Sequence, residues 1–339
     1  MEDYQDGAAM ENDDDRSNVS LCSGEVRVTG HVNAAVVLVL FPIGLLWNSL
    51  VIAIVLKKKL FIRPSNMLML SLAIANLLVC FFLMIPTFAL GVLVGFRTTP
   101  SMMATVDRIC QIGVFLPLLA FNNSCTVALM AVDRAIYLKK PLTYDQIVTP
   151  RRMLFMIAAV WIVCIAIAIL PLFKLGEIGF YQAIASCSLI IEDKVFFYVI
   201  IALAGLMNLI QIVGCGIIIY SIRKHLLMKL RQKITFVNSV KDSYRPDLLK
   251  DYNKTQLQLL KVFGVIFSIS VLTYLPMVGQ GIVLMLSFNL CNVFIKAIFI
   301  FILFRSVIHP IVESFMTNEI RDVLSKILHC GKGKCKCTC

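Results

Sequence analysis

The chain has 339 residues, of which 59% are hydrophobic and only 15% are charged, and its mean hydropathy is +0.86. Soluble domains contain about 45–50% apolar and about 25% charged residues, so the composition excludes an ordinary soluble protein and indicates a membrane protein. The formal net charge of +12 does not indicate a nucleic-acid partner. Acidic residues crowd into residues 1–30, and basic residues lie in alternate gaps between apolar runs, a pattern that sets orientation in a bilayer.

Residues 1–30 are polar and acidic and show no periodicity, so we expect a disordered tail. Asn18 begins Asn18-Val19-Ser20, a glycosylation acceptor if this end of the chain lies outside the cell.

Seven apolar stretches follow, each near or above the ~20 residues that a helix needs to cross hydrocarbon. We expect them at about 32–57, 66–94, 108–138, 152–173, 195–224, 256–286 and 292–315. Helices are expected because every backbone amide needs an internal partner in lipid. The fold class is therefore an all-α membrane protein, a seven-transmembrane helix bundle over residues 31–315 with a short amphipathic eighth helix over residues 316–329 and a tail over residues 330–339.

The gaps between the apolar stretches indicate how the bundle is oriented. One set of gaps is rich in bases, among them Lys57-Lys58-Lys59, Arg63, Lys139-Lys140, Arg151-Arg152, Arg223-Lys224-His225, Lys229, Arg231 and Lys233. Because basic loops stay in the cytoplasm, we expect an extracellular N-terminus, a cytoplasmic C-terminus and a multi-pass protein of the plasma membrane. The segment after the seventh stretch is too short to span and is expected to lie along the inner surface.

Several motifs occur in a fixed order along these stretches. They are Gly44-Leu45-Leu46-Trp47-Asn48, Leu72-Ala73-Ile74-Ala75-Asn76-Leu77, Asp133-Arg134-Ala135, Trp161 with Pro171, Tyr220, Leu275-Pro276, and His309-Pro310-Ile311-Val312-Glu313. In this order the chain resembles a divergent rhodopsin-like (class A) G-protein-coupled receptor. The resemblance implies an extracellular ligand and a heterotrimeric G protein as partners, arrestin as a further candidate, and contact with membrane lipid. It implies no enzyme activity, catalytic residue, cofactor, metal or nucleic-acid partner.

The resemblance also implies functional residues. Arg134 would pair with Asp133 or release it and face a partner, which makes a two-state element. The coupling switch would comprise Asp133, Arg134, Tyr220, His309, Pro310 and Glu313, and a helix-six switch would comprise Tyr274 and Pro276. Asn48, Asn76 and Asn123 would form an internal polar network. With His309 these residues would make a neutral hydrogen-bonded cluster, and ordinary helix-packing contacts are the alternative interpretation.

The cysteines divide into pairs and a terminal group. The resemblance implies a disulfide between Cys110 and Cys187, in an oxidising compartment. Cys22 and Cys291 would form a second bridge or remain free thiols. Cys330, Cys335, Cys337 and Cys339 lie among lysines and are predicted palmitoylation sites, which we rank above a zinc site.

Departures from the family pattern limit the ligand. Asn76 replaces the aspartate that anchors sodium, so sodium modulation is not expected. The stretch Phe115-Leu116-Pro117-Leu118-Leu119 has no acid to bind a cationic amine, which favours a peptide or an apolar small molecule. The candidate pocket residues are Gln111, Phe115, Leu116, Leu119, Met277, Gln280 and Phe299. The main alternative is a receptor-fold protein with altered or lost coupling, in a decoy, constitutive or scaffold role. A channel or transporter ranks lower.

Overall fold

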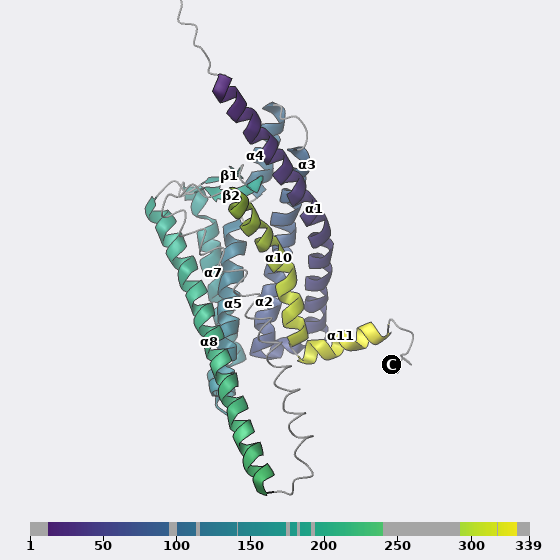
Figure 1. The fold of residues 1–339 in the computed structure, drawn as a ribbon, viewed down its shortest axis with the longest axis vertical. Coiled ribbons are helices and arrows are strands. Elements are labelled where there is room, and N and C mark those ends of the chain that lie inside the picture. The colour runs from purple at the N-terminus through teal and green to yellow at the C-terminus, as the bar shows by residue number, and fades with distance from the viewer. Residues whose placement is uncertain are drawn as a thin grey trace, which may run out of the picture.

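The computed structural model describes residues 13–94, 100–112, 116–140, 142–173, 177–181, 184–190, 194–239, 292–316 and 318–330. In this part of the chain, long helices run side by side and a two-stranded hairpin crosses one end of them (Figure 1). The expected span at 256–286, with Tyr274 and Pro276, lies outside the described residues.

The first helix, α1 (Asp13–Lys57), starts far earlier than the sequence suggested. Residues 13–30, for which the sequence suggested a disordered tail, are helical in the structure. Tertiary contacts explain part of this difference. Gly30 packs so tightly on α3 that a Cβ added to Gly91 would overlap the Gly30 carbonyl and lie 2.9 Å from the Ala34 Cβ. Such a crossing brings two helix backbones into direct contact and holds this extension of α1.

The second span is a continuous rod made of α2 (Pro64–Val79), a π-helical turn η2 (Cys80–Met84) and α3 (Ile85–Leu93). Pro86 explains the π turn, because a proline lacks an N–H and its ring collides with the preceding turn of an α-helix. Widening the helix just before Pro86 lets the rod continue. The turn also adds one residue to the register between the faces of α2 and α3.

The expected third span covers parts of two described helices. α4 (Pro100–Ile112) precedes α5 (Leu116–Lys139), and residues 113–115 are not described. α5 packs against α2, α7 (Pro150–Ala168) and α8 (Lys194–Ser239), which makes it the central helix of the described bundle. The lower end of α8 projects beyond the other described helices (Figure 1).

Short elements connect these helices. A 3-10 turn η1 (Leu60–Ile62) joins α1 to α2, the one-turn helix α6 (Tyr144–Ile147) lies between α5 and α7, and η4 (Leu170–Phe173) follows α7. Strands β1 (Glu177–Tyr181) and β2 (Ser186–Ile190) form an antiparallel hairpin in which Phe180 faces Cys187. Within the described residues, which are otherwise helical, this hairpin is a local β element.

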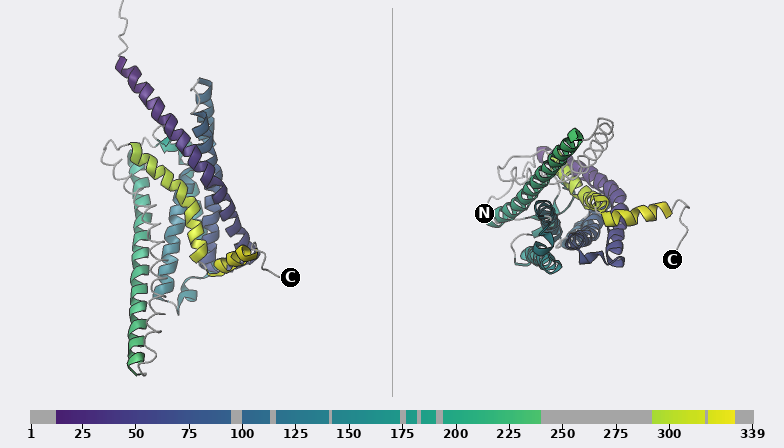
Figure 2. Two further views of the ribbon diagram at one scale, coloured as in Figure 1. Left: turned by 45° about the vertical axis from the view of Figure 1, so that its right-hand side comes forward. Right: turned by 90° about the horizontal axis from the view of Figure 1, so that it is seen from below.

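The last two helices are α10 (Asn292–Met316) and α11 (Asn318–Cys330). Ile320 and Leu324 of α11 are buried in an apolar cluster with Val51 and Val55 of α1, and α11 extends sideways from the bundle (Figure 2). Three helical stretches of the described chain are long and apolar enough to cross a membrane: Glu25–Lys57, Pro64–Leu93 and Pro150–Ala168.

Candidate functional site

Asp133 lies near the end of α5 and is only 3% exposed. Its Oδ1 accepts a 2.6 Å hydrogen bond from the Tyr144 hydroxyl, and its Oδ2 accepts a 2.8 Å bond from the Ser65 hydroxyl at the start of α2. The two hydroxyl oxygens lie 3.4 Å apart. Each carboxylate oxygen therefore has its own donor, as a buried anion requires.

The segment between α5 and α7 is held in place so that Tyr144 can reach Asp133. Arg152 donates from Nη1 to the carbonyls of Gln146 and Ile147, at 3.1 and 2.9 Å, which satisfies the end of α6. The Tyr144 ring packs edge-on against Tyr137, with centroids 5.2 Å apart. Burial, together with the hydrogen bond to the Asp133 carboxylate, raises the pKa of Tyr144 to about 12, so the hydroxyl keeps its proton at neutral pH.

Arg134, the next residue, is half-buried. In the described part of the chain it forms no ion pair with Asp133, whose oxygens are engaged by Ser65 and Tyr144. Of the two arrangements expected from the sequence, the structure contains the one in which Asp133 is bound elsewhere. Asp133 therefore accepts no hydrogen bond from the N–H donors of the Arg134 guanidinium.

The predicted polar network is buried in the bundle. Asn48 donates to the carbonyls of Gly44, at 2.8 Å, and Ser306, at 3.4 Å, and so links α1 to α10. Asn76 is 1% exposed and Asn123 is 7% exposed, but the described residues provide no hydrogen bond for Asn76 Nδ2 or Asn123 Oδ1. The structure therefore brings these amides inside without joining them to one another.

The surroundings of His309 include a charged residue that the predicted neutral cluster did not contain. Arg305 lies one turn before His309 on α10 and is only 7% exposed, so a guanidinium is buried beside the imidazole. Burying a charged side chain is costly unless other groups pair with it, which sets this position of α10 apart. Sequence reasoning missed Arg305, although a base within Phe304-Arg305-Ser306 was a visible signal.

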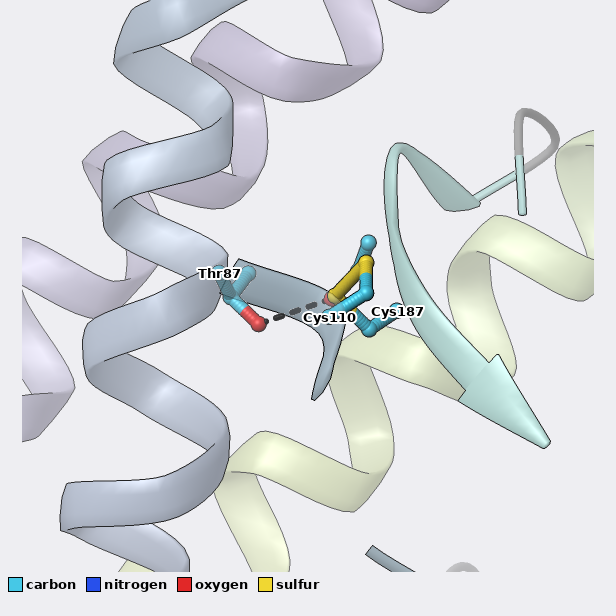
Figure 3. The surroundings of a disulfide bond; sticks show 4 residues. Thr87, Cys110 and Cys187 are labelled. Carbon is cyan, nitrogen blue, oxygen red and sulfur yellow. Dashed lines mark hydrogen bonds between the residues drawn. A yellow bond between two sulfur atoms is a disulfide. The ribbon is translucent and has the colours of Figure 1, made fainter. Parts of the chain in front are cut away.

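The hairpin is tied to the opposite end of the bundle. A disulfide joins Cys187 of β2 to Cys110 of α4, with Cα atoms 5.3 Å apart (Figure 3). Beside it, the hydroxyls of Ser186 and Thr87 are hydrogen-bonded at 2.9 Å. On α1, Asn33 Nδ2 donates to the Ile184 carbonyl at 2.6 Å. The hairpin is therefore anchored to α1, α3 and α4.

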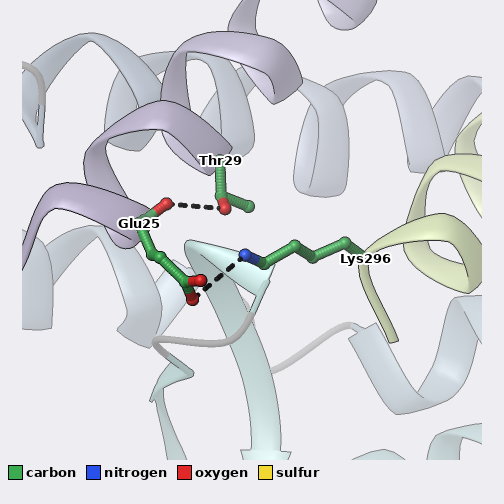
Figure 4. Close-up of polar contacts among 3 residues, drawn as sticks. All are labelled: Glu25, Thr29 and Lys296. Atoms are coloured by element: carbon green, nitrogen blue, oxygen red, sulfur yellow. Dashed lines mark hydrogen bonds and ion pairs between the residues drawn. The ribbon is translucent and has the colours of Figure 1, made fainter. Parts of the chain in front are cut away.

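At the same end of the bundle as the hairpin, an ion pair joins α10 to α1. Lys296 Nζ of α10 lies 3.6 Å from a carboxylate oxygen of Glu25 on α1, and the two side chains point toward one another (Figure 4). The Glu25 side chain is 61% exposed, so solvent weakens the attraction and the pair contributes little stability.

The structure describes only some of the remaining predicted residues. Tyr220 of α8 is 66% exposed, so its side chain does not join Asp133. Pro310 lies inside α10, Phe299 is buried, and Gln111 is exposed on α4. The side chains that are not described are Asn18, Cys22, Leu116, Leu119, Glu313 and Cys330, and the residues that lie wholly outside the described part are Phe115, Tyr274, Pro276, Met277, Gln280, Cys291, Cys335, Cys337 and Cys339.

Ser65, Tyr144, Asn33 and Thr87 were also missed. Each has an ordinary polar side chain without a motif, and its importance comes from a contact with a distant part of the chain. No signal in the sequence identified them.

Comparison with known proteins finds receptors of similar sequence. The chain is 31% identical over 166 residues to the dopamine D2-like receptor of Drosophila melanogaster, which covers 48% of this chain and 18% of that receptor. It is 24% identical over 212 residues to cannabinoid receptor 1 of Xenopus laevis, with 60% and 44% covered. It is 34% identical over 151 residues to the alpha-2B adrenergic receptor of Elephas maximus, with 43% and 36% covered. The chain thus spans less than half the length of these relatives.

The family pattern of the 7 transmembrane receptors of the rhodopsin type matches residues 47–313. This range begins at Trp47, beside the Asn48 contact, and contains Asp133, Tyr144 and the disulfide between Cys110 and Cys187. Proteins of this family are multi-pass membrane receptors coupled to G proteins, and they are not enzymes. The chain therefore belongs to the 7 transmembrane receptor (rhodopsin) family.

Proposed function

We propose that this chain is a cell-surface receptor of the plasma membrane that transmits the binding of an extracellular ligand to a cytoplasmic heterotrimeric G protein. Its N-terminus lies outside the cell, and its basic loops lie inside. The observation that carries the proposal is the state of Asp133. Both of its carboxylate oxygens are engaged by hydroxyls of other segments, so the adjacent Arg134 can bind an incoming partner.

The contacts of Asp133 suggest how a ligand signal would reach the G protein. Asp133 is the last buried acid of α5, and its partners lie at the start of α2 and in the loop after α5. A movement of α5 relative to α2 would change both hydrogen bonds together. A buried cluster with two discrete arrangements is the kind of element that binding at a distant site can bias.

The ligand is proposed to be a peptide or an apolar small molecule. Two of the relatives are amine receptors by name. This chain has no acid in its stretch Phe115–Leu119 to balance a cationic amine, and an ammonium ion buried without a counter-ion is strongly unfavourable. We therefore propose that the ligand of this chain belongs to a different chemical class from the amines of those two relatives.

Further features complete the proposal. Asn18 carries a glycan, and Cys330 with the cysteines after it carries palmitate next to anionic lipid. Cys22 and Cys291 form a second bridge or remain free thiols, and arrestin binds the same inner face as the G protein. Helix α11 lies along the inner membrane surface, with Ile320 and Leu324 directed toward α1.

A cell assay tests the proposal. Basal and ligand-screened G-protein activation is measured for the native chain and for Arg134→Ala at equal surface expression. Arg152→Ala is the matched control, because it removes an exposed arginine that binds only the neighbouring loop carbonyls. We expect Arg134→Ala to abolish activation and Arg152→Ala to retain it. Equal activation by the native chain and Arg134→Ala would refute a coupling role for Arg134.

A further inference from the structure

Two cysteines from different helices meet inside the bundle. Cys125 lies in the middle of α5, and Cys164 lies in the second half of α7. Neither forms a disulfide in the structure, and a hydrogen bond joins their side chains. An S–H group is a weak donor, so this bond contributes little stability by itself. Its importance is that it places two thiol groups in direct contact.

The packing of α5 against α7 accounts for this contact. Leu129 of α5 packs on the apolar cluster that contains Met153, near the start of α7. Phe121 of α5 packs on a second apolar cluster, which contains Cys164. Cys125 lies one turn from each of these two α5 residues, on the same side of the helix. The two clusters bracket Cys125, so its contact with Cys164 follows from the register of the two helices.

The pair is shielded from water, but Cys125 is accessible from lipid. Cys164 is 0% exposed, whereas Cys125 keeps partial exposure. The residues before Cys164, Ile162 and Val163, are 66% and 54% exposed. Because α7 is apolar and long enough to cross a membrane, such exposed aliphatic side chains face lipid chains. A molecule that dissolves in the bilayer therefore reaches Cys125 more readily than one that stays in water.

Cys80 shows what distinguishes this pair. Its side chain is 0% exposed, and the described residues of its apolar cluster include no second cysteine. A single buried thiol behaves as a small hydrophobic side chain and has no partner with which to close a disulfide. Cys125 and Cys164 have the same apolar surroundings, and in addition each has a thiol beside it. Oxidation to a bridge is therefore open to the pair and closed to Cys80.

We infer that Cys125 and Cys164 form an oxidisable dithiol whose oxidant is a hydroperoxide dissolved in the membrane lipid. Cys125 Sγ attacks the terminal peroxide oxygen, the O–O bond breaks, and the thiol proton leaves with the alkoxide as an alcohol. Cys164 Sγ then attacks the sulfur of the resulting sulfenic acid, and water leaves as the S–S bond forms. The two thiols lose two hydrogen atoms and two electrons, which the hydroperoxide gains.

The bridge would join α5 covalently to α7 about two helical turns before Asp133. It would also be long-lived. Water-soluble reductants such as glutathione carry charges, and moving a charge into hydrocarbon is strongly unfavourable. The state of the pair would therefore record exposure of the surrounding lipid to hydroperoxides.

The test uses the purified full chain in nanodiscs of saturated lipid, which forms no hydroperoxide of its own. Cumene hydroperoxide is the lipid-soluble oxidant, and hydrogen peroxide at the same concentration is the water-soluble control. The chain is then unfolded in dodecyl sulfate that contains N-ethylmaleimide, which blocks the remaining thiols, and its peptides are analysed by mass spectrometry. We expect two peptides joined through Cys125 and Cys164, lighter than the separate peptides by two hydrogen atoms. Cumene hydroperoxide should give the higher yield.

Variants and the other cysteine provide the controls. Cys80→Ala should give the native yield of joined peptide, and Cys164→Ala should give none. In the native chain, Cys80 should remain a free thiol. The inference is overturned if no peptide joins Cys125 to Cys164, if Cys80 is oxidised as readily as the pair, or if hydrogen peroxide gives an equal yield. The measurement needs neither a ligand nor a G protein, so its result is independent of the proposed receptor function.

Discussion

Replacing Tyr144 by Phe isolates the hydrogen bond that holds Asp133. The change removes one oxygen atom and keeps the ring, which packs in an apolar cluster with Leu68 and Met130. It leaves Asp133 Oδ1, in a residue only 3% exposed, without its 2.6 Å donor. A hydrogen bond to a charged group is worth about 1.5–3 kcal/mol, so we expect a loss of roughly 2 kcal/mol in the free energy of unfolding.

The assay is thermal unfolding of the purified chain in nanodiscs. For 339 residues the entropy of unfolding is about 0.7 kcal/mol/K, so about 2 kcal/mol corresponds to a fall of roughly 3 °C in the melting temperature. Tyr137→Phe is the matched control, because it removes the hydroxyl of a neighbouring tyrosine that is 52% exposed. Equal melting temperatures for Tyr144→Phe and Tyr137→Phe would refute the reasoning.

A double-mutant cycle sharpens the same prediction. Ser65→Ala removes the other donor to Asp133, and the two hydroxyl oxygens are themselves 3.4 Å apart. Residues that share a buried charged partner show interaction energies of about 0.5–3 kcal/mol. We therefore expect the losses of Ser65→Ala and Tyr144→Phe to be non-additive. Simple additivity would mean that the two hydroxyls do not act on one carboxylate.

Two contacts elsewhere in the chain and the titration of Tyr144 give three further predictions. Gly91→Ala should destabilise the protein by about 1–3 kcal/mol, because the added Cβ would overlap α1. Gly205→Ala is the control, because a Cβ there meets nothing within 4 Å. Equal melting temperatures for the two variants would contradict the close crossing of α1 and α3. Cys110→Ser and Cys187→Ser should each lower the free energy of unfolding by about 2–5 kcal/mol, as measured by denaturant unfolding. The double variant should lose no more than either single variant, because both remove the same bridge. Additive losses would exclude the bridge. Tyr144 should titrate near pH 12 by ultraviolet difference spectra against Tyr144→Phe. Because the folded-state pKa is raised above the usual value of about 10, its stabilisation is complete below that pH and lost as the pH rises toward 12; titration near 10 would show an exposed hydroxyl.

The sequence predicted the long elements well where apolar length alone determines them. The last expected span, 292–315, nearly coincides with α10, and the first was expected to end at Lys57, where α1 ends. Both follow from the need of a spanning helix for about 20 apolar residues. The start of α1 was predicted wrongly because the helix continues through polar residues, and its extension is held partly by Gly91 and Lys296 in distant segments.

The candidate site was predictable only in part, for a similar reason. Asp133 stands out because an acid beside an arginine is rare at the end of an apolar span. Its partners Ser65 and Tyr144 are ordinary polar residues, and only the packing of α2 and α6 against α5 brings them to the carboxylate. Ile184 likewise has no signal, because an isoleucine near a strand is common and its burial depends on three helices.

The central claim is that Arg134 couples this receptor to a G protein, and GDP release from a purified heterotrimer tests it most directly. The native chain in nanodiscs is added to heterotrimers of each main class, and Arg134→Ala and Tyr137→Phe are measured beside it. We expect the native chain and Tyr137→Phe to accelerate GDP release from at least one class, and Arg134→Ala to leave the spontaneous rate unchanged. Release that Arg134→Ala accelerates as strongly as the native chain would contradict the account.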